Sequence, residues 1–157
     1  MSIIHNERVY LDACYIDDNY KKHLHNKIKH CYNGSCNNDN GYILSVNKIE
    51  IVDNYIPNAS SGIFFIVNLH IDCMYPNKTD VYNGVVLIIL KEGLLCNVDN
   101  VMKVIIPVKE LNKRKYFLDN NNEYTNKKNI LKIGTKIEIK ITNIKYSSGF
   151  KCIGTFN

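Results

Sequence analysis

The stretch from Tyr82 to Leu111 constrains the fold more than any other part of the chain. It holds three short apolar runs, rich in β-branched residues and separated by the turn Lys91-Glu92-Gly93 and an Asp-Asn turn. This pattern predicts three consecutive antiparallel strands. Farther on, the alternation from Lys136 to Ile141 predicts a fourth strand and Phe150–Phe156 a fifth. Five strands with one long connection predict a small barrel of the oligonucleotide-binding type.

The first half of the chain has a different pattern. Strands are predicted at 4–11, from Tyr42 to Asn47 continuing toward Val52, and at 63–74, with a loop at 53–62. We expect Asp17-Asp18-Asn19 to cap a helix over 20–31 with their side chains, and Asn33-Gly34 to end it. The sequence therefore predicts two domains, an α+β domain at residues 1–76 with one helix packed on an antiparallel sheet, and an all-β five-stranded barrel at 77–157.

The cysteines indicate reduced thiols rather than disulfides. Six cysteines are scattered along 157 residues, most of them within apolar segments. Cys31 shares a helix face with Leu24 and Ile28, so we expect it in the core, and we expect Cys36 to pack within the same domain. These features predict a reducing compartment. Neither a membrane-spanning run nor a signal peptide is recognisable, so no membrane partner is expected.

The charge balance is mildly basic. The net charge of +5 is compatible with nucleic acid, although solvated lysine faces explain such a value equally well. Asn, Ile, Lys and Tyr dominate the composition, and all four have A/T-rich codons.

The order of short motifs resembles two known families. Gly84 opening the first barrel strand, Gly93 before the second, Ile106-Pro107-x-x-Glu110-Leu111 and Gly134-x-Lys136-Ile137 resemble the S1 class of RNA-binding barrels. The whole order, from about Ile4 to Phe156, resembles the stalk subunit of multisubunit RNA polymerases, known as the seventh subunit of RNA polymerase II and the archaeal E subunit. Among its motifs are Gly34-Ser35-Cys36, Gly41-Tyr42-Ile43 and Cys152-Ile153-Gly154-Thr155.

The resemblance implies a non-catalytic accessory subunit of a DNA-directed RNA polymerase. Its N-terminal tip domain would dock to the large subunits beside the clamp, and its S1-like barrel would lie near the nascent single-stranded RNA. Partners would include the polymerase core and a small helical stalk subunit. The expected location is the nucleus or another site of transcription. A/T-biased composition and a short C-terminus favour a large DNA virus or another divergent lineage. If viral, the chain would be found in the virion and the host cytoplasm.

RNA contacts are predicted where cations and aromatic rings occur together, because single-strand binders combine backbone-tracking cations with stacking rings. One group follows the third strand and another flanks the last hairpin. The candidate residues are Lys91, Lys103, Lys109, Lys113, Arg114, Lys115, Tyr116, Phe117, Lys145, Tyr146 and Lys151. The alternative is that Tyr116 and Phe117 seal one end of the barrel. Leu94-Leu95 stands where S1 domains often carry a stacking aromatic, and 120–126 is predicted to be a polar, mobile loop.

Polymerase contacts are predicted in the tip domain. The loop after residue 52 should expose Tyr55 and Ile56, and exposed apolar residues of this kind often anchor interfaces. Ile56 folded back under its own sheet is the alternative. The candidate residues are Asp53, Asn54, Tyr55, Ile56, Pro57, Gly34, Ser35 and Cys36.

Other function classes find less support. Cys31 and Cys36 with His23, His25 and His30 form at most half of a zinc site, so no metal or other cofactor is expected. Neither a nucleophile elbow nor a phosphate-binding glycine loop is present, and we predict no active site. The main rival is a free-standing S1-type protein that binds single-stranded RNA.

Overall fold

The computed structural model describes residues 1–157, which divide into two compact units, Met1–Met74 and Tyr75–Asn157. None of its helices has the length and apolar character that crossing a bilayer requires. The first unit contains one α-helix, a short 3-10 helix and four strands. These are β1 Ser2–Leu11, η1 Ala13–Tyr15, α1 Tyr20–Tyr32, β2 Cys36–Asn37, β3 Gly41–Tyr55 and β4 Ile63–Met74.

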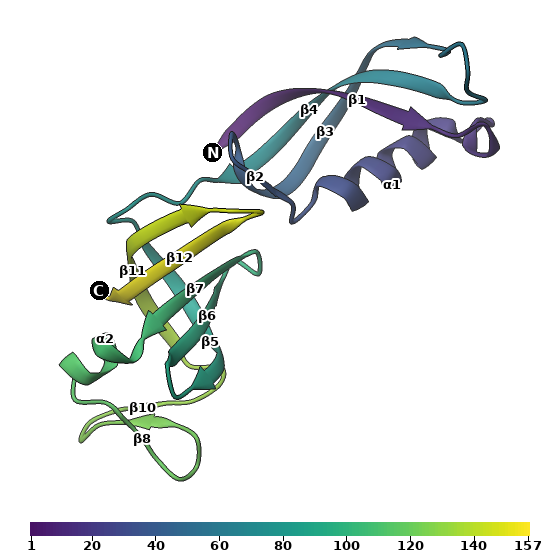
Figure 1. Ribbon diagram of the computed structural model, residues 1–157. Helices are drawn as coiled ribbons and strands as arrows, with labels where there is room; N and C mark the ends of the chain where they lie inside the picture. The colour runs from purple at the N-terminus through teal and green to yellow at the C-terminus, as the bar shows by residue number, and fades with distance from the viewer. The chain divides into compact units, whose positions relative to one another are not determined.

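The first unit is an antiparallel sheet with α1 packed along one face (Figure 1). The strand order is β1-β4-β3-β2, so β4 is a central strand and alternate residues along it are buried. Leu24 and Ile28 of α1 are fully buried against this face. Burying two such side chains contributes about 3–6 kcal/mol before conformational entropy is subtracted. This unit confirms the α+β part of the predicted fold class.

Three predictions about this unit are wrong in detail. Cys31 is exposed, because its position lies in the last turn of α1, beyond the buried pair Leu24 and Ile28. The side chain of Asn19, the residue before the helix, makes no capping hydrogen bond, and the carboxylate of Asp17 instead accepts from the amide of Asn19 at 2.7 Å. Strand β3 extends to Tyr55, since its last residues pair with β4, and this shortens the loop predicted at 53–62.

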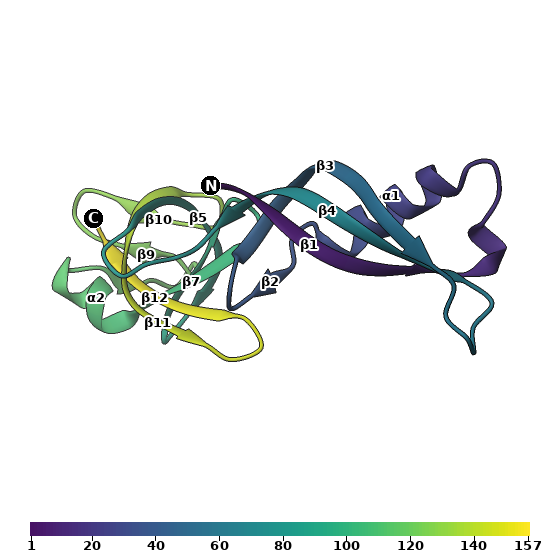
Figure 2. The same cartoon turned by 90° about the horizontal axis from the view of Figure 1, so that it is seen from above.

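The second unit is a closed five-stranded barrel with a helix and a small extra sheet (Figure 2). The barrel order is β11-β12-β7-β6-β5, closed by pairing of β5 with β11. All pairs are antiparallel except β12 with β7, as in an oligonucleotide-binding barrel. The strands are β5 Val81–Leu90, β6 Gly93–Val98, β7 Met102–Pro107, β11 Lys136–Tyr146 and β12 Phe150–Phe156. The predicted barrel is therefore confirmed.

The long connection between β7 and β11 is structured. It contains α2 Val108–Lys113 and a three-stranded sheet of β8 Phe117–Leu118, β9 Tyr124–Thr125 and β10 Ile130–Leu131. Tyr124 is 1% exposed and its hydroxyl donates to the carbonyl of Leu90 at 2.7 Å, which fastens this sheet to the β5–β6 turn. The prediction of a mobile loop at 120–126 is therefore wrong for Tyr124 and Thr125, because a buried ring holds that segment in a sheet.

Candidate nucleic-acid interface

The two units differ in charge. Residues 75–157 carry fourteen Lys and Arg against seven Asp and Glu, a balance of +7, whereas residues 1–74 carry six against eight, a balance of −2. A basic surface is the electrostatic footprint expected for binding to a phosphate backbone. The barrel unit is therefore the place to look for a nucleic-acid interface.

Apart from Lys103 on β7, the predicted RNA-binding residues lie at two opposite ends of the barrel. Strands β7 and β12 are parallel, so α2, which follows β7, lies at the end where β12 finishes. Lys91 is at this end too. It lies in the turn just before Gly93, and Gly93 pairs with Pro107, the last residue of β7. The β11–β12 hairpin, with Lys145, Tyr146 and Lys151, lies at the other end. Because β7 is about 17 Å long at 3.3 Å per residue, the two groups do not form one cluster.

At the α2 end, several of the predicted cations already have partners. Lys113 Nζ lies 2.6 Å from a carboxylate oxygen of Glu110, and hydrogen bonds from Lys113 and Thr155 lower the pKa of that carboxyl. The Arg114 guanidinium donates to the Phe156 and Asn157 carbonyls and lies 5.5 Å from the centre of the Phe156 ring. The cations left without such partners at this end are Lys91, Lys109 and Lys115.

Tyr116 and Phe117 are neighbours in the sequence, but one is buried and the other exposed. Tyr116 is 7% exposed and stacks on Phe156 at 5.7 Å, so it closes the end of the barrel. Phe117 is 62% exposed in β8 and shares an open pocket of about 410 Å³ with Lys115 and Lys127. Phe117 is thus the ring available for stacking at this end.

The hairpin end also combines rings with cations. Lys145 and Lys151 face each other across β11 and β12, and Tyr146 pairs with Phe150 in the same way. The Phe150 ring lies 5.0 Å from Tyr146 and 5.2 Å from Tyr75, both of which are exposed by about two fifths. Because successive residues of a strand point to opposite faces, the rings lie on one face of this hairpin and the two lysines on the other.

Two rows of outward-facing residues cross the side of the barrel. The first, Lys136, Val85, Asn97 and Lys103, is formed by direct partners on β11, β5, β6 and β7. The second, Ile88, Leu95, Ile105 and Ile153, is formed by partners on β5, β6, β7 and β12. Leu95 faces outward here, so aliphatic side chains occupy this row and no aromatic ring lies in it. Lys136 was missing from the predicted residues because only strand pairing brings it beside Val85.

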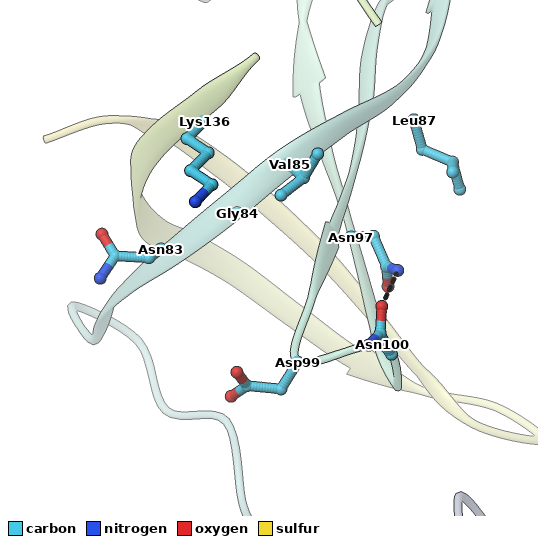
Figure 3. A pocket seen from close by; sticks show the side chains of 8 residues that line it. All are labelled: Asn83, Gly84, Val85, Leu87, Asn97, Asp99, Asn100 and Lys136. Atoms are coloured by element: carbon cyan, nitrogen blue, oxygen red, sulfur yellow. Dashed lines mark hydrogen bonds between the residues drawn. The ribbon is translucent and has the colours of Figure 1, made fainter. Parts of the chain in front are cut away.

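The first row borders an open pocket of about 590 Å³ (Figure 3). Most of its polar lining comes from Asn83, Asn97, Asp99, Asn100 and Lys136. Asn97 donates its amide N–H to Asn100 Oδ1 at 3.2 Å, and Asn97 Oδ1 is buried without a hydrogen-bond partner.

The residues predicted to contact the polymerase do not form one patch. Cys36 pairs with Tyr42 near the start of β3, and the amide of Gly34 donates to the Ile43 carbonyl at 2.8 Å. Asp53, Asn54 and Tyr55 lie at the other end of the same strand, paired with β4, and Ile56 and Pro57 follow them. Gly34, Ser35 and Cys36 are thus separated from the group at 53–57 by the length of β3, as Figure 1 also shows.

The group at 53–57 includes an aromatic cluster and one free apolar residue. The ring of Tyr55 stacks on Phe64 at 5.3 Å, Tyr10 packs against the same ring at 5.1 Å, and Arg8 donates to the Tyr55 hydroxyl at 2.9 Å. Ile56 is 71% exposed, which excludes the alternative in which it folds under the sheet. At this end of the unit, the exposed Ile56 therefore directly follows a packed aromatic cluster.

Two further features concern metal ligation and buried titratable groups. No group of three or more His, Cys, Asp or Glu side chains is arranged to hold a metal ion. Burial raises the pKa of the Cys96 thiol to about 12, and burial with the Asp80 hydrogen bond raises the pKa of Tyr82. These groups are protonated at neutral pH and lie within the barrel unit as packing residues.

Comparison with known proteins matches both units. Residues 7–63 match the family described as "SHS2 domain found in N terminus of Rpb7p/Rpc25p/MJ0397", and residues 75–149 match the S1 RNA binding domain. No curated protein matches the chain. One solved structure, the apo form of Mycoplasma genitalium RNase R, aligns at 16% identity and a TM-score of 0.43, over 51% of this chain and 13% of that chain. With the two domains in this order, the chain belongs to the stalk-subunit family of multisubunit RNA polymerases.

Proposed function

We propose that this chain is a non-catalytic subunit of a DNA-directed RNA polymerase, docked to the polymerase core by residues 1–74 and holding its barrel beside the emerging transcript. The observation that carries the proposal is the succession of the two matched domains along the chain. A site of transcription is the location that follows from this function.

The charge division supports a separate task for each unit. The barrel has a surplus of cations, whereas the first unit has a slight surplus of acids and an exposed apolar residue, Ile56, at one end of its sheet. Protein interfaces are anchored by apolar residues on rigid supports, and nucleic-acid contacts depend on cations. We assign protein contact to the first unit and RNA contact to the barrel.

Co-purification of the tagged full chain from its native source tests the proposal. Large polymerase subunits should be recovered in stoichiometric amounts. The variant Ile56→Asp should lose them, because a charge at a buried interface position is costly. Val52→Asp, at a residue 58% exposed on β3, the strand that precedes Ile56, is the matched control and should keep them.

Two other results would each change the assignment. Loss of the polymerase with Val52→Asp but not with Ile56→Asp would move the docking surface from Ile56 to the part of β3 around Val52. Recovery of RNA without polymerase subunits would favour a free-standing S1-type RNA-binding protein, for which the basic barrel alone is sufficient.

A further inference from the structure

The row of Lys136, Val85, Asn97 and Lys103 is the starting point for an inference about how the barrel holds RNA. Its two lysines are exposed, and neither ammonium group makes a hydrogen bond or an ion pair. They are three strand spacings apart, about 14 Å along the sheet at ~4.8 Å per spacing. Two free cations at this distance leave room for a base between the phosphates that they contact.

The lining of the pocket beside this row is suited to a flat ring. Val85 and Leu87, both 37% exposed, give it an apolar side, and Gly84 between Asn83 and Val85 lines it with backbone (Figure 3). The volume of about 590 Å³ is within the ~300–1,000 Å³ typical of ligand pockets. An apolar wall with a few convergent polar groups is the usual form of a small-ligand site.

The hydrogen-bonding groups of the pocket are mainly acceptors. Asn97 Oδ1 is buried without a partner, and Asn100 Oδ1 accepts only the bond from Asn97. The carboxylate of Asp99 adds a third acceptor from the same β6–β7 turn. Asp99 and Asn100 both have positive φ, 50° and 60°, as tight hairpin turns require. This turn holds the acceptors on a rigid support next to Lys103.

We propose that this pocket is a nucleobase subsite for single-stranded RNA. The base enters between Lys103 and Lys136, which neutralise the flanking phosphates. Its exocyclic amino group donates to Asn97 Oδ1, which a small side-chain movement uncovers, while the Asn97 amide N–H keeps its hydrogen bond to Asn100 Oδ1. Adenine, cytosine and guanine carry such an amino group. Uracil can donate only from N3–H, which lies between two carbonyl oxygens that the other acceptors of the pocket would repel. The subsite therefore favours the first three bases over uracil. This inference rests on the RNA contact assigned to the barrel above.

Binding of oligo(A), oligo(C) and oligo(U) to the full chain tests the subsite. The wild type should bind oligo(A) and oligo(C) about tenfold more tightly than oligo(U), which is within the discrimination that one base contact provides. Asn97→Leu should abolish this preference. Asn100→Gly, which keeps the positive φ, should weaken it without the risk of disturbing the strand.

The lysines are tested by the salt dependence of binding. Lys103→Gln and Lys136→Gln should each weaken binding to all three oligonucleotides, and each should reduce the slope of log affinity against log salt by about 0.7, the value for one phosphate contact in a single strand. Lys140→Gln is the matched control. It is an exposed lysine on β11, about 13 Å along the strand from Lys136 at 3.3 Å per residue, and should leave the slope unchanged.

The outcomes separate this inference from the proposed function. A wild-type chain that binds oligonucleotides with no base preference, or with slopes unaffected by both lysine changes, overturns the subsite alone. A wild-type chain that binds none of the oligonucleotides removes the RNA contact proposed for the barrel as well. Co-purification of the Lys103→Gln, Lys136→Gln double variant with polymerase subunits is independent of both results and tests only the docking.

Discussion

Replacement of Gly93 by alanine is predicted to open the barrel. Gly93 begins β6 with φ +147°, a conformation that side chains rarely adopt. A Cβ added there would lie 2.1 Å from the backbone carbonyl oxygen of Ile106, whereas real Cβ atoms essentially never approach closer than 3.0 Å. Strand β6 would have to move away from β7 at the Gly93–Pro107 pair, next to the hydrogen bond from the Val108 amide to the Glu92 carbonyl.

The free energy of this change has two parts. Backbone strain at such a φ costs about 1–3 kcal/mol. Separating the strands adds the lost hydrogen bond and packing, about 2 kcal/mol more. The sum is roughly 3–5 kcal/mol, a large part of the stability of a small domain. Gly149→Ala is the matched control, because Gly149 has φ +134° with no atom within 4 Å and therefore incurs only the strain.

The buried thiols provide the assay, since the chain contains no tryptophan. Alkylation followed by mass spectrometry reports the opening of the barrel at Cys96 and Cys152, and that of the first unit at Cys73, all of which are buried. With Gly93→Ala, Cys96 should react about thirtyfold faster than with Gly149→Ala, the ratio that ~2 kcal/mol produces. The rate at Cys73 should be unchanged. Equal rates at Cys96 in the two variants would refute the steric reasoning.

Three further predictions concern other contacts of the chain. Tyr124→Phe removes the hydroxyl that donates to the Leu90 carbonyl, and unfolding measurements should show a loss of about 1 kcal/mol, the usual net value of one hydrogen bond; an unchanged stability would mean that the hydroxyl is not essential. Glu110 has a pKa lowered by Lys113 and Thr155, so its contribution is present above the ordinary value of 4.5 and is lost as pH falls below it. Glu110→Gln should therefore lower the melting temperature at pH 7 but not at pH 3, and an equal effect at both pH values would contradict this linkage. Under native conditions Cys14 and Cys31 should react with a thiol reagent before Cys73, Cys96 and Cys152, as mass spectrometry of each cysteine will show; early reaction at a buried cysteine would contradict the packing.

The barrel strands were predictable because their periodicity is local. Runs of β-branched residues and the two turns reveal β5, β6 and β7, and the alternation from Lys136 reveals the start of β11. Helix α2 and the small sheet were missed, because six-residue helices and two-residue strands carry too few residues for a periodic signal. Only a tertiary contact, the burial of Tyr124, distinguishes that sheet from a loop.

The candidate sites were less predictable than the fold, because side chains become neighbours through strand pairing. Lys136 and Lys103 are 33 positions apart in the sequence, and the register of three strand pairs places them in one row with Asn97. Residues that the sequence places in one group can also be far apart in the fold. Gly34 and Tyr55 belong to one predicted group, yet β3 separates them. Composition indicated which types of residue are candidates for binding, and topology decides which of them lie together.

Two paired strands of the first unit, β3 and β4, differ in length, and this difference curves the sheet. Between the pairs Tyr42–Met74 and Tyr55–Phe64, β3 uses three more residues than β4, and three register shifts absorb them. Those residues amount to about 10 Å of extra backbone along one strand. When one strand of a pair has more residues than its partner over the same span, the pair bends. Deleting one residue at each shift would make the two paths equal and flatten the sheet on which α1 packs.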